Sequence, residues 1–190
     1  MNGRIILVTV ALALFAGSAG AQGWSIGSNV GFSVLSPKSG GDKIYVFGAP
    51  SSAGPIVPSF QPGLRFGVPV GAGENEGYFD LGLSVLGTSG GGGTSTGYQV
   101  TANLQHNFKT NGAAWPYVNL GGGVMGQSFS AGESMSNPIL GGGIGVLEHV
   151  GNGHGAVRAE VRYDYVFKDP QGFEGGALLG IKLGFDLYMK

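Results

Sequence analysis

Charged residues alternate with apolar ones along a short segment near the C-terminus, and this spacing limits the chemistry they could do. The four charges are Arg158, Glu160, Arg162 and Asp164, set among apolar residues between Val157 and Phe167. A β-strand points successive side chains to opposite faces, so all four charges share one face. In a soluble sheet that face would meet bulk water. In an outer-membrane barrel it would line a narrow lumen, where opposite charges can pair.

Residues suited to catalysis or metal binding are few. The histidines His106, His149 and His154 show no metal-binding spacing such as HExxH. His149 could act as a base beside Glu148, but no serine lies close on the neighbouring predicted strands, so a nucleophilic site is not expected. The chain has no cysteine, which removes disulfides, thiolate metal sites and a lipoprotein anchor. We therefore expect no enzyme activity, no metal and no cofactor.

Composition favours a membrane barrel over a water-exposed one. Charged residues are 11% of the chain, against about 25% in ordinary soluble domains. Glycine accounts for 40 of the 190 residues, and the net charge of −1 gives no basic surface for nucleic acid. A soluble lipocalin-like barrel stays open as an alternative. It would be favoured if the protein were stably soluble without detergent.

The N-terminus resembles a secretory signal peptide. Arg4 precedes an apolar run from Ile5 to Ala16, and the small residues Ala19, Gly20 and Ala21 form a cleavage site. The alternative is a transmembrane anchor, but the run is shorter than the roughly 20 apolar residues that a spanning helix needs. We expect residues 1–21 to be the signal peptide and residues 22–190 to form one domain.

Period-two patterns predict eight strands in the mature chain. They cover residues 24–35, 63–70, 78–86, 98–108, 116–125, 139–148, 155–167 and 177–189. Most are close to the roughly 9–11 residues that a tilted strand needs to cross a bilayer. An even number of antiparallel strands closes the sheet and leaves no edge exposed to lipid. The predicted fold is all-β: an eight-stranded antiparallel up-and-down transmembrane β-barrel.

The predicted connections alternate in length. Residues 71–77, 109–114 and 150–154 are short turns, as on the periplasmic side of bacterial barrels, and the other connections are mostly longer. The longest covers residues 36–62, and we expect its apolar residues to form a loop surface for binding: Tyr45, Val46, Phe47, Ile56 and Phe60.

Aromatic residues fall near the predicted strand ends, where an interfacial girdle would be. Near the turns lie Trp24, Phe79, Phe108, Trp115 and Tyr117, and near the longer loops lie Tyr98, Tyr165 and Phe167. Aromatic residues are also common in strands generally, so the pattern supports the barrel without proving it.

The inward-facing charges balance. Four are cationic and four anionic: Arg65, Arg158, Arg162 and Lys182 against Asp80, Glu160, Asp164 and Asp186. An eight-stranded interior is just wide enough to be filled by side chains, and unpaired buried charges are costly. If the last two strands form a hairpin, Arg158 lies near Asp186, and Glu160 lies within reach of Lys182. We expect these charges to plug the lumen. Solvated charges in a wet lumen are the alternative.

Two segments carry a resemblance to the eight-stranded outer-membrane barrel superfamily, which includes outer membrane protein A-type and W-type barrels. Arg158–Tyr165 is similar to the penultimate strand of porin-family small barrels. The last strand resembles the C-terminal signal read by the barrel assembly machinery, with Lys182, Gly184, Leu187 and Met189 at its key positions. The resemblance implies an outer-membrane location. The implied partners are outer-membrane lipid, the barrel assembly machinery and periplasmic chaperones.

The expected function is that of an integral outer-membrane barrel with a structural or surface-interaction role. Its loops would be displayed outside, and its lumen would be plugged by charge. One alternative, implied by the W-type resemblance, is a passive channel for small or hydrophobic solutes. Another is a membrane-embedded lipid A-modifying enzyme. Conductance separates the channel from the first function, and mass analysis of lipid A tests the enzyme.

Overall fold

The computed structural model describes most of the predicted domain. The described residues are 23–38, 40, 44–48, 63–70, 74–87, 94–129, 134–168 and 175–189. The predicted signal peptide, residues 1–21, lies outside them. No helix in this part of the chain is long and apolar enough to cross a membrane.

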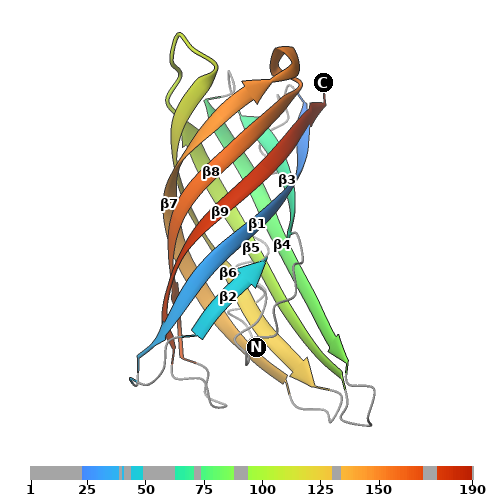
Figure 1. Ribbon diagram of the computed structural model, residues 1–190, viewed down its shortest axis with the longest axis vertical. Coiled ribbons are helices and arrows are strands. Elements are labelled where there is room, and N and C mark those ends of the chain that lie inside the picture. The colour runs from blue at the N-terminus through green and yellow to red at the C-terminus, as the bar shows by residue number, and fades with distance from the viewer. Residues whose placement is uncertain are drawn as a thin grey trace.

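Nine strands and one short 3-10 helix make up the described structure (Figure 1). The strands are β1 (Trp24–Pro37), β2 (Ile44–Gly48), β3 (Gly63–Val70), β4 (Asn75–Gly87), β5 (Thr94–Asn107), β6 (Ala114–Phe129), β7 (Ser134–Val150), β8 (Gly155–Val166) and β9 (Gly176–Met189). The helix η1 (Gly151–Gly153) joins β7 to β8, and Asn152 there has φ 57°, the left-handed conformation that asparagine tolerates in tight turns.

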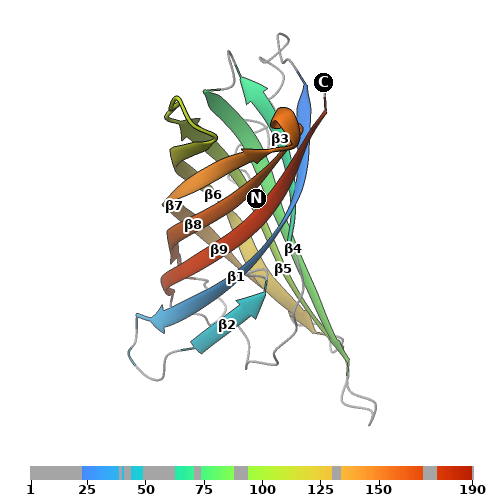
Figure 2. The ribbon, with the colours of Figure 1, turned by 45° about the horizontal axis from the view of Figure 1, so that its top comes forward.

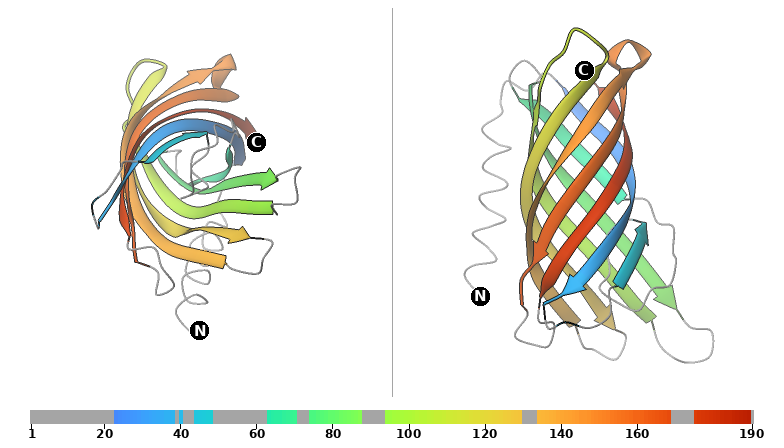
Figure 3. Two further views of the ribbon diagram at one scale, coloured as in Figure 1. Left: turned by 60° about the horizontal axis from the view of Figure 1, so that its bottom comes forward. Right: turned by 60° about the vertical axis from the view of Figure 1, so that its left-hand side comes forward.

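The strands form one closed antiparallel sheet, as the sequence predicts. Consecutive strands pair from β3 to β9, and β9 pairs with β1 from Trp24↔Met189 to Pro37↔Gly176. Strands β2 and β3 together occupy one strand position of the wall, next to β1. β1 pairs with β3 through residues 25–29 and with β2 through residues 31–35. The barrel therefore has eight strand positions around its axis (Figure 3).

The two ends of the barrel differ. The turn end carries Trp24, Met189, η1 and the turn between β5 and β6, and it lies at the top of Figure 1. The loop end carries the connections after β1, β4, β6 and β8. In Figure 2, β2 lies beside the loop-end half of β1.

The wall is apolar outside and polar inside. Large apolar side chains are exposed around the outer face, including Leu83, Leu104, Leu120 and Ile144 at 60–65% exposure. The buried side chains are mostly polar or charged, because alternate residues of each tilted strand face the lumen. This is the reverse of a soluble domain, and it indicates that lipid surrounds the outer face.

Three predictions about strand boundaries were wrong. Tyr45, Val46 and Phe47 belong to β2 and pair with β1, whereas we expected them in a free loop. The other two residues of that predicted surface, Ile56 and Phe60, lie outside the described residues. Strand β4 begins at Asn75, inside the predicted turn 71–77. Strands β6 and β7 extend past their apolar segments, because ladder hydrogen bonds need only backbone, which Gly- and Ser-rich segments supply.

A charge on the outer face should be costly only at mid-height. Leu120→Arg, near the middle of β6, should lower the free energy of unfolding by about 2–4 kcal/mol, since lipid cannot solvate the charge. Val150→Arg, outward at the turn end of β7, should cost about 0–1 kcal/mol. Urea unfolding in lipid vesicles measures both. Equal costs would contradict a lipid-facing belt.

Candidate functional site

Asp186 is the point where two arginines meet inside the barrel. It lies on β9 with no exposed surface, and it forms an ion pair with Nε of Arg158 on β8. Nη2 of Arg158 donates a second hydrogen bond to Asp186 Oδ1 at 3.1 Å. Nε of Arg65, from β3, lies 3.7 Å from Asp186 Oδ1. The structure thus contains the Arg158–Asp186 pair expected from a hairpin of the last two strands.

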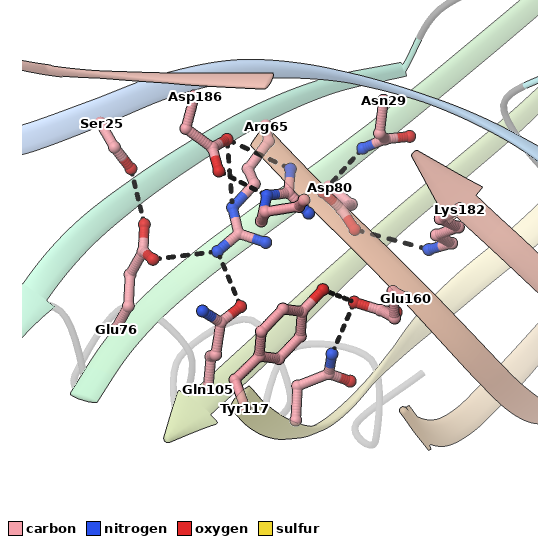
Figure 4. A network of polar contacts seen from close by, with 12 residues as sticks. Ser25, Asn29, Arg65, Glu76, Asp80, Gln105, Tyr117, Glu160, Lys182 and Asp186 are labelled. Atoms are coloured by element: carbon pink, nitrogen blue, oxygen red, sulfur yellow. Dashed lines mark hydrogen bonds and ion pairs between the residues drawn. The ribbon is translucent and has the colours of Figure 1, made fainter. Parts of the chain in front are cut away.

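Arg65 connects this pair to the opposite wall (Figure 4). Its Nη2 donates to Glu76 Oε2 at 3.0 Å and to Gln105 Oε1 at 3.1 Å. Its guanidinium carbon lies 3.4 Å from the ring centroid of Tyr78, a cation–π contact in a desolvated setting. Ser25 on β1 donates to the other oxygen of Glu76 at 2.6 Å. Arg65 is therefore held by groups from three other strands.

A second group of charges lies nearer the loop end. Lys182 Nζ lies 3.6 Å from Asp80 Oδ2, and Asn29 Nδ2 donates to Asp80 Oδ1 at 3.2 Å. We expected Lys182 within reach of Glu160, and the two residues do stand opposite each other in the β8–β9 ladder. The Lys182 side chain instead crosses the lumen to β4. The order of neighbouring strands does not show which side chains form ion pairs across the barrel interior.

Glu160 and Arg162 form the third group, on β8. Tyr117 donates its hydroxyl to Glu160 Oε2 at 3.0 Å, and Asn119 Nδ2 donates to the same oxygen at 2.7 Å. Arg162 Nε donates to both oxygens of Asp164 at 2.8 and 2.9 Å. Its Nη1 donates to Asn119 Oδ1 at 2.9 Å and lies 3.9 Å from Glu160 Oε1. All eight charges named from the sequence thus face the lumen, at 9% exposure or less.

The charges of this network do not balance, contrary to the prediction. Glu76 is 2% exposed and belongs to the network as a fifth carboxylate against four cations. We expected residue 76 in a turn, because glycine residues flank the segment. The spacing between Glu76 and Asp80 could have placed Glu76 inside the barrel, since residues 76, 78 and 80 share one face of β4.

Inward-facing glycines provide the space in which these side chains lie. A Cβ on Gly27 would collide with Asp186, one on Gly67 with Glu76, and one on Gly141 with Asp164. A Cβ on Gly184 would lie 2.8 Å from Arg158 Nη2. The charged groups therefore rest flat against neighbouring backbone, and the high glycine content has a packing reason.

Apolar and aromatic groups of β6 to β9 pack beside the charges, toward both ends of the barrel. Toward the turn end, Tyr117, Leu147 and Ala156 are buried together, with Tyr188 packed against them. Toward the loop end lies a layer of four buried residues, each 4% exposed or less: Met125, Ile139, Val166 and Leu178. These inward apolar residues were not predicted, because apolar residues were assigned to the lipid face throughout.

Two of the predicted girdle aromatics are not at the lipid interface. Tyr117 is 1% exposed and faces the lumen. Trp115 has the same inward parity on β6, and its ring stacks edge-on against His149 at 4.5 Å between centroids. Phe108, Trp24 and Phe167 are exposed near strand ends, as a girdle requires.

The described histidines do not build a catalytic pair. His149 lies on the lumen side of β7, between the rings of Trp115 and Tyr188. Glu148, the next residue, points to the opposite side and is exposed. Within the described part of the chain, no three His, Asp or Glu residues are grouped to hold a metal ion.

The four residues of the predicted assembly signal all lie on β9. Lys182 is buried in the lumen and Gly184 lies on the same face, whereas Leu187 and Met189 face outward near the turn end. Their alternation matches an inward polar side and an outward apolar side. Recognition by an assembly machinery stays a prediction.

Comparisons with known proteins find the fold and no family. No protein family and no curated protein sequence matches the chain. Neisserial surface protein A (NspA) matches with a TM-score of 0.67 and 16% identity, over 90% of this chain and 99% of that one. Ail of Yersinia pestis, solved with the heparin analogue sucrose octasulfate, matches at 0.53 and 19%, over 88% and 99%. The outer membrane protein AlkL matches at 0.52 and 16%, over 90% and 92%.

The shared fold and the lipid-facing belt agree. Both the topology and the outward apolar surface are those of small outer-membrane barrels. The chain is therefore a membrane-spanning β-barrel of the outer-membrane type.

Breaking the central ion pair should be far more costly than breaking a surface one. Asp186→Asn should lower the free energy of unfolding by about 3–5 kcal/mol, because two buried arginines lose their shared carboxylate. Glu74→Gln removes the exposed Lys109–Glu74 pair and should cost about 0–1 kcal/mol. Urea unfolding in vesicles measures both. Comparable losses would show that the network is solvated.

Adjacent glycines should respond differently to a methyl group. In Gly121→Ala the new Cβ would lie 2.5 Å from Asn103 Cγ and from the Ala102 carbonyl oxygen, so we expect a loss of about 1–3 kcal/mol in unfolding free energy. In Gly122→Ala the Cβ points outward, 3.0 Å from the Ile139 carbonyl oxygen, and we expect a loss of about 0.5 kcal/mol. A larger loss for Gly122→Ala would contradict the inner packing role.

Proposed function

We propose that this protein is a non-conducting outer-membrane barrel whose rigid body displays loops for contacts at the cell surface. The observation that carries the proposal is the buried network across the lumen. Every described strand except β2 and β7 contributes a side chain to it, and β7 contributes glycines against which those side chains pack. Groups from opposite walls meet, as Lys182 of β9 meets Asp80 of β4.

The ion pairs support a closed lumen. An ion on the axis would meet charged groups that each already have a partner: Arg65 with Glu76, Arg158 with Asp186, Arg162 with Asp164, and Lys182 with Asp80. Buried apolar groups on β6 to β9 pack beside this network, toward both ends of the barrel. A solute-conducting lumen would need the paired groups to move apart.

The surface role rests on the loop end and on the likeness to surface proteins. Four strands end at the loop end, β1, β4, β6 and β8, and the chain continues from each of them there. Among the structures with the same fold are a surface protein of Neisseria and the attachment invasion locus protein of Yersinia pestis. We assign no catalytic role. The partners we propose are outer-membrane lipid and, during biogenesis, periplasmic chaperones and the barrel assembly machinery acting on β9.

Conductance in planar bilayers tests the closed lumen. We expect no discrete steps from the refolded wild type, and we expect steps from the double variant Arg65→Ala/Asp186→Ala. This variant removes the two central groups of the network and leaves its summed charge unchanged.

The matched control is Lys109→Ala/Glu74→Ala, which removes one ion pair at the exposed turn end. A heat-dependent gel shift confirms that each barrel is folded. Steps from the wild type would instead support the passive channel. Silence from the folded double variant would show that closure of the lumen does not depend on Arg65 and Asp186.

A further inference from the structure

A small pocket lies where β3 begins, beside the Lys182–Asp80 ion pair. Its lining combines four buried polar side chains with two glycines and one leucine: Asn29, Asp80, Gln99, Lys182, Gly63, Gly82 and Leu81. Gly63 and Gly82 have no side chains to fill the space. The pocket is on the loop-end side of the Arg65 cluster and shares Asp80 and Lys182 with the network, whereas Gln99 belongs to the pocket alone.

The strand pairing in the barrel wall changes at the height of this pocket. Pairing between β3 and β4 ends at Leu64↔Leu81. From Gly82 to Gly87, β4 pairs with β5, and no described strand pairs with its other edge. β2 takes the place of β3 beside β1 from Gly31 onward. The pocket therefore lies at a seam where β3 begins, between β1 and β4, and it is bordered by Leu81, whose parity on β4 is that of the lipid-facing side.

Two groups in the pocket point to the chemistry of a ligand. Gln99 is 2% exposed, and its Oε1 accepts no hydrogen bond from any described residue. Lys182 carries three N–H donors, and its ion pair with Asp80 is long, at 3.6 Å. The pocket thus offers one open acceptor and one cationic donor to the same occupant.

Charge decides between the possible head groups. The network already holds five carboxylates against four cations, so an anionic head would add to an excess of negative charge. A cationic head would stand beside the ammonium of Lys182. A hydroxyl adds no charge, donates to Gln99 Oε1 and accepts from Lys182 Nζ.

We propose that this pocket binds the hydroxyl head of a neutral amphiphile, whose apolar chain lies at the seam beside Leu81. The polar end is recognised by Gln99 and Lys182, and the apolar end remains in the lipid-facing region. This inference does not depend on whether the lumen conducts.

Titration of the protein in nanodiscs with 1-decanol tests the proposal. We expect saturable NMR shifts of the Gly63, Gly82 and Gln99 amide resonances. Loss of one neutral hydrogen bond in Gln99→Leu should weaken binding by about two- to tenfold. Thr101→Val is the matched control, because Thr101 is buried on the same face of β5 but does not line the pocket. It should bind decanol as the wild type does.

Other probes and a second variant keep the proposal falsifiable. Decane, decanoate and decylammonium enter the same nanodiscs and should each give weaker shifts than decanol. Equal shifts with decane would mean a purely apolar site, and stronger ones with decanoate or decylammonium would mean a charge-selective site. Either result overturns the proposal, as does the absence of saturable shifts with decanol. If Gln99→Leu does not fold, Lys182→Met replaces it and should weaken decanol binding at least as much.

Discussion

The shared carboxylate of Asp186 is the interaction on which the interior depends. It lies between Arg158 of β8 and Arg65 of β3. Because β1 separates β3 from β9, this contact joins the last strand to the strands on the other side of β1. Closure of β1 on β9 places Gly27 directly opposite Asp186, and only a glycine leaves room there for the carboxylate. Closure therefore brings Arg65 to the carboxylate that Arg158 already reaches within the β8–β9 hairpin. Open strand edges and unpaired charges both lack water in lipid, so closure removes both costs.

The glycine content follows from the same constraint. An eight-stranded barrel has little interior volume, yet this one holds four long cationic side chains and several tyrosines and glutamines. Inward glycines on β6 and β7 leave the space that a larger side chain would fill, so that Asn103, Asp164 and Glu160 lie directly against the backbone. A composition that elsewhere would suggest disorder here reflects close packing. The strands remain regular because ladder hydrogen bonds on both sides hold each glycine extended.

Strand faces could be predicted from the sequence, whereas contacts across the lumen could not. Period two assigned Arg158 and Asp186 to the interior, and neighbouring register brought them together. Lys182 of β9 reaches across the lumen to Asp80 of β4, and the spacing of residues along one strand does not specify such a contact. Glu76 was missed because its segment has the composition of a turn, although its parity with Asp80 was correct. Trp115 and Tyr117 were misplaced because aromatics suit both a membrane interface and a crowded lumen, and only parity along β6 separates the two.

Buried ion pairs are not efficient stabilisers, so the persistence of this network needs another reason. The register of the sheet supplies one. The side-chain period is two, and a slip of one residue would move Arg158, Glu160, Arg162 and Asp164 from the lumen into lipid together. Each cation at the bilayer centre would then cost about 2–4 kcal/mol, with no partner across the lumen to offset it. An interior of small apolar residues would carry no such penalty, and glycine-rich strands such as β6 and β7 would be free to slide. The charges on β8 and β9 therefore fix the alignment that the glycines on β6 and β7 leave weakly specified.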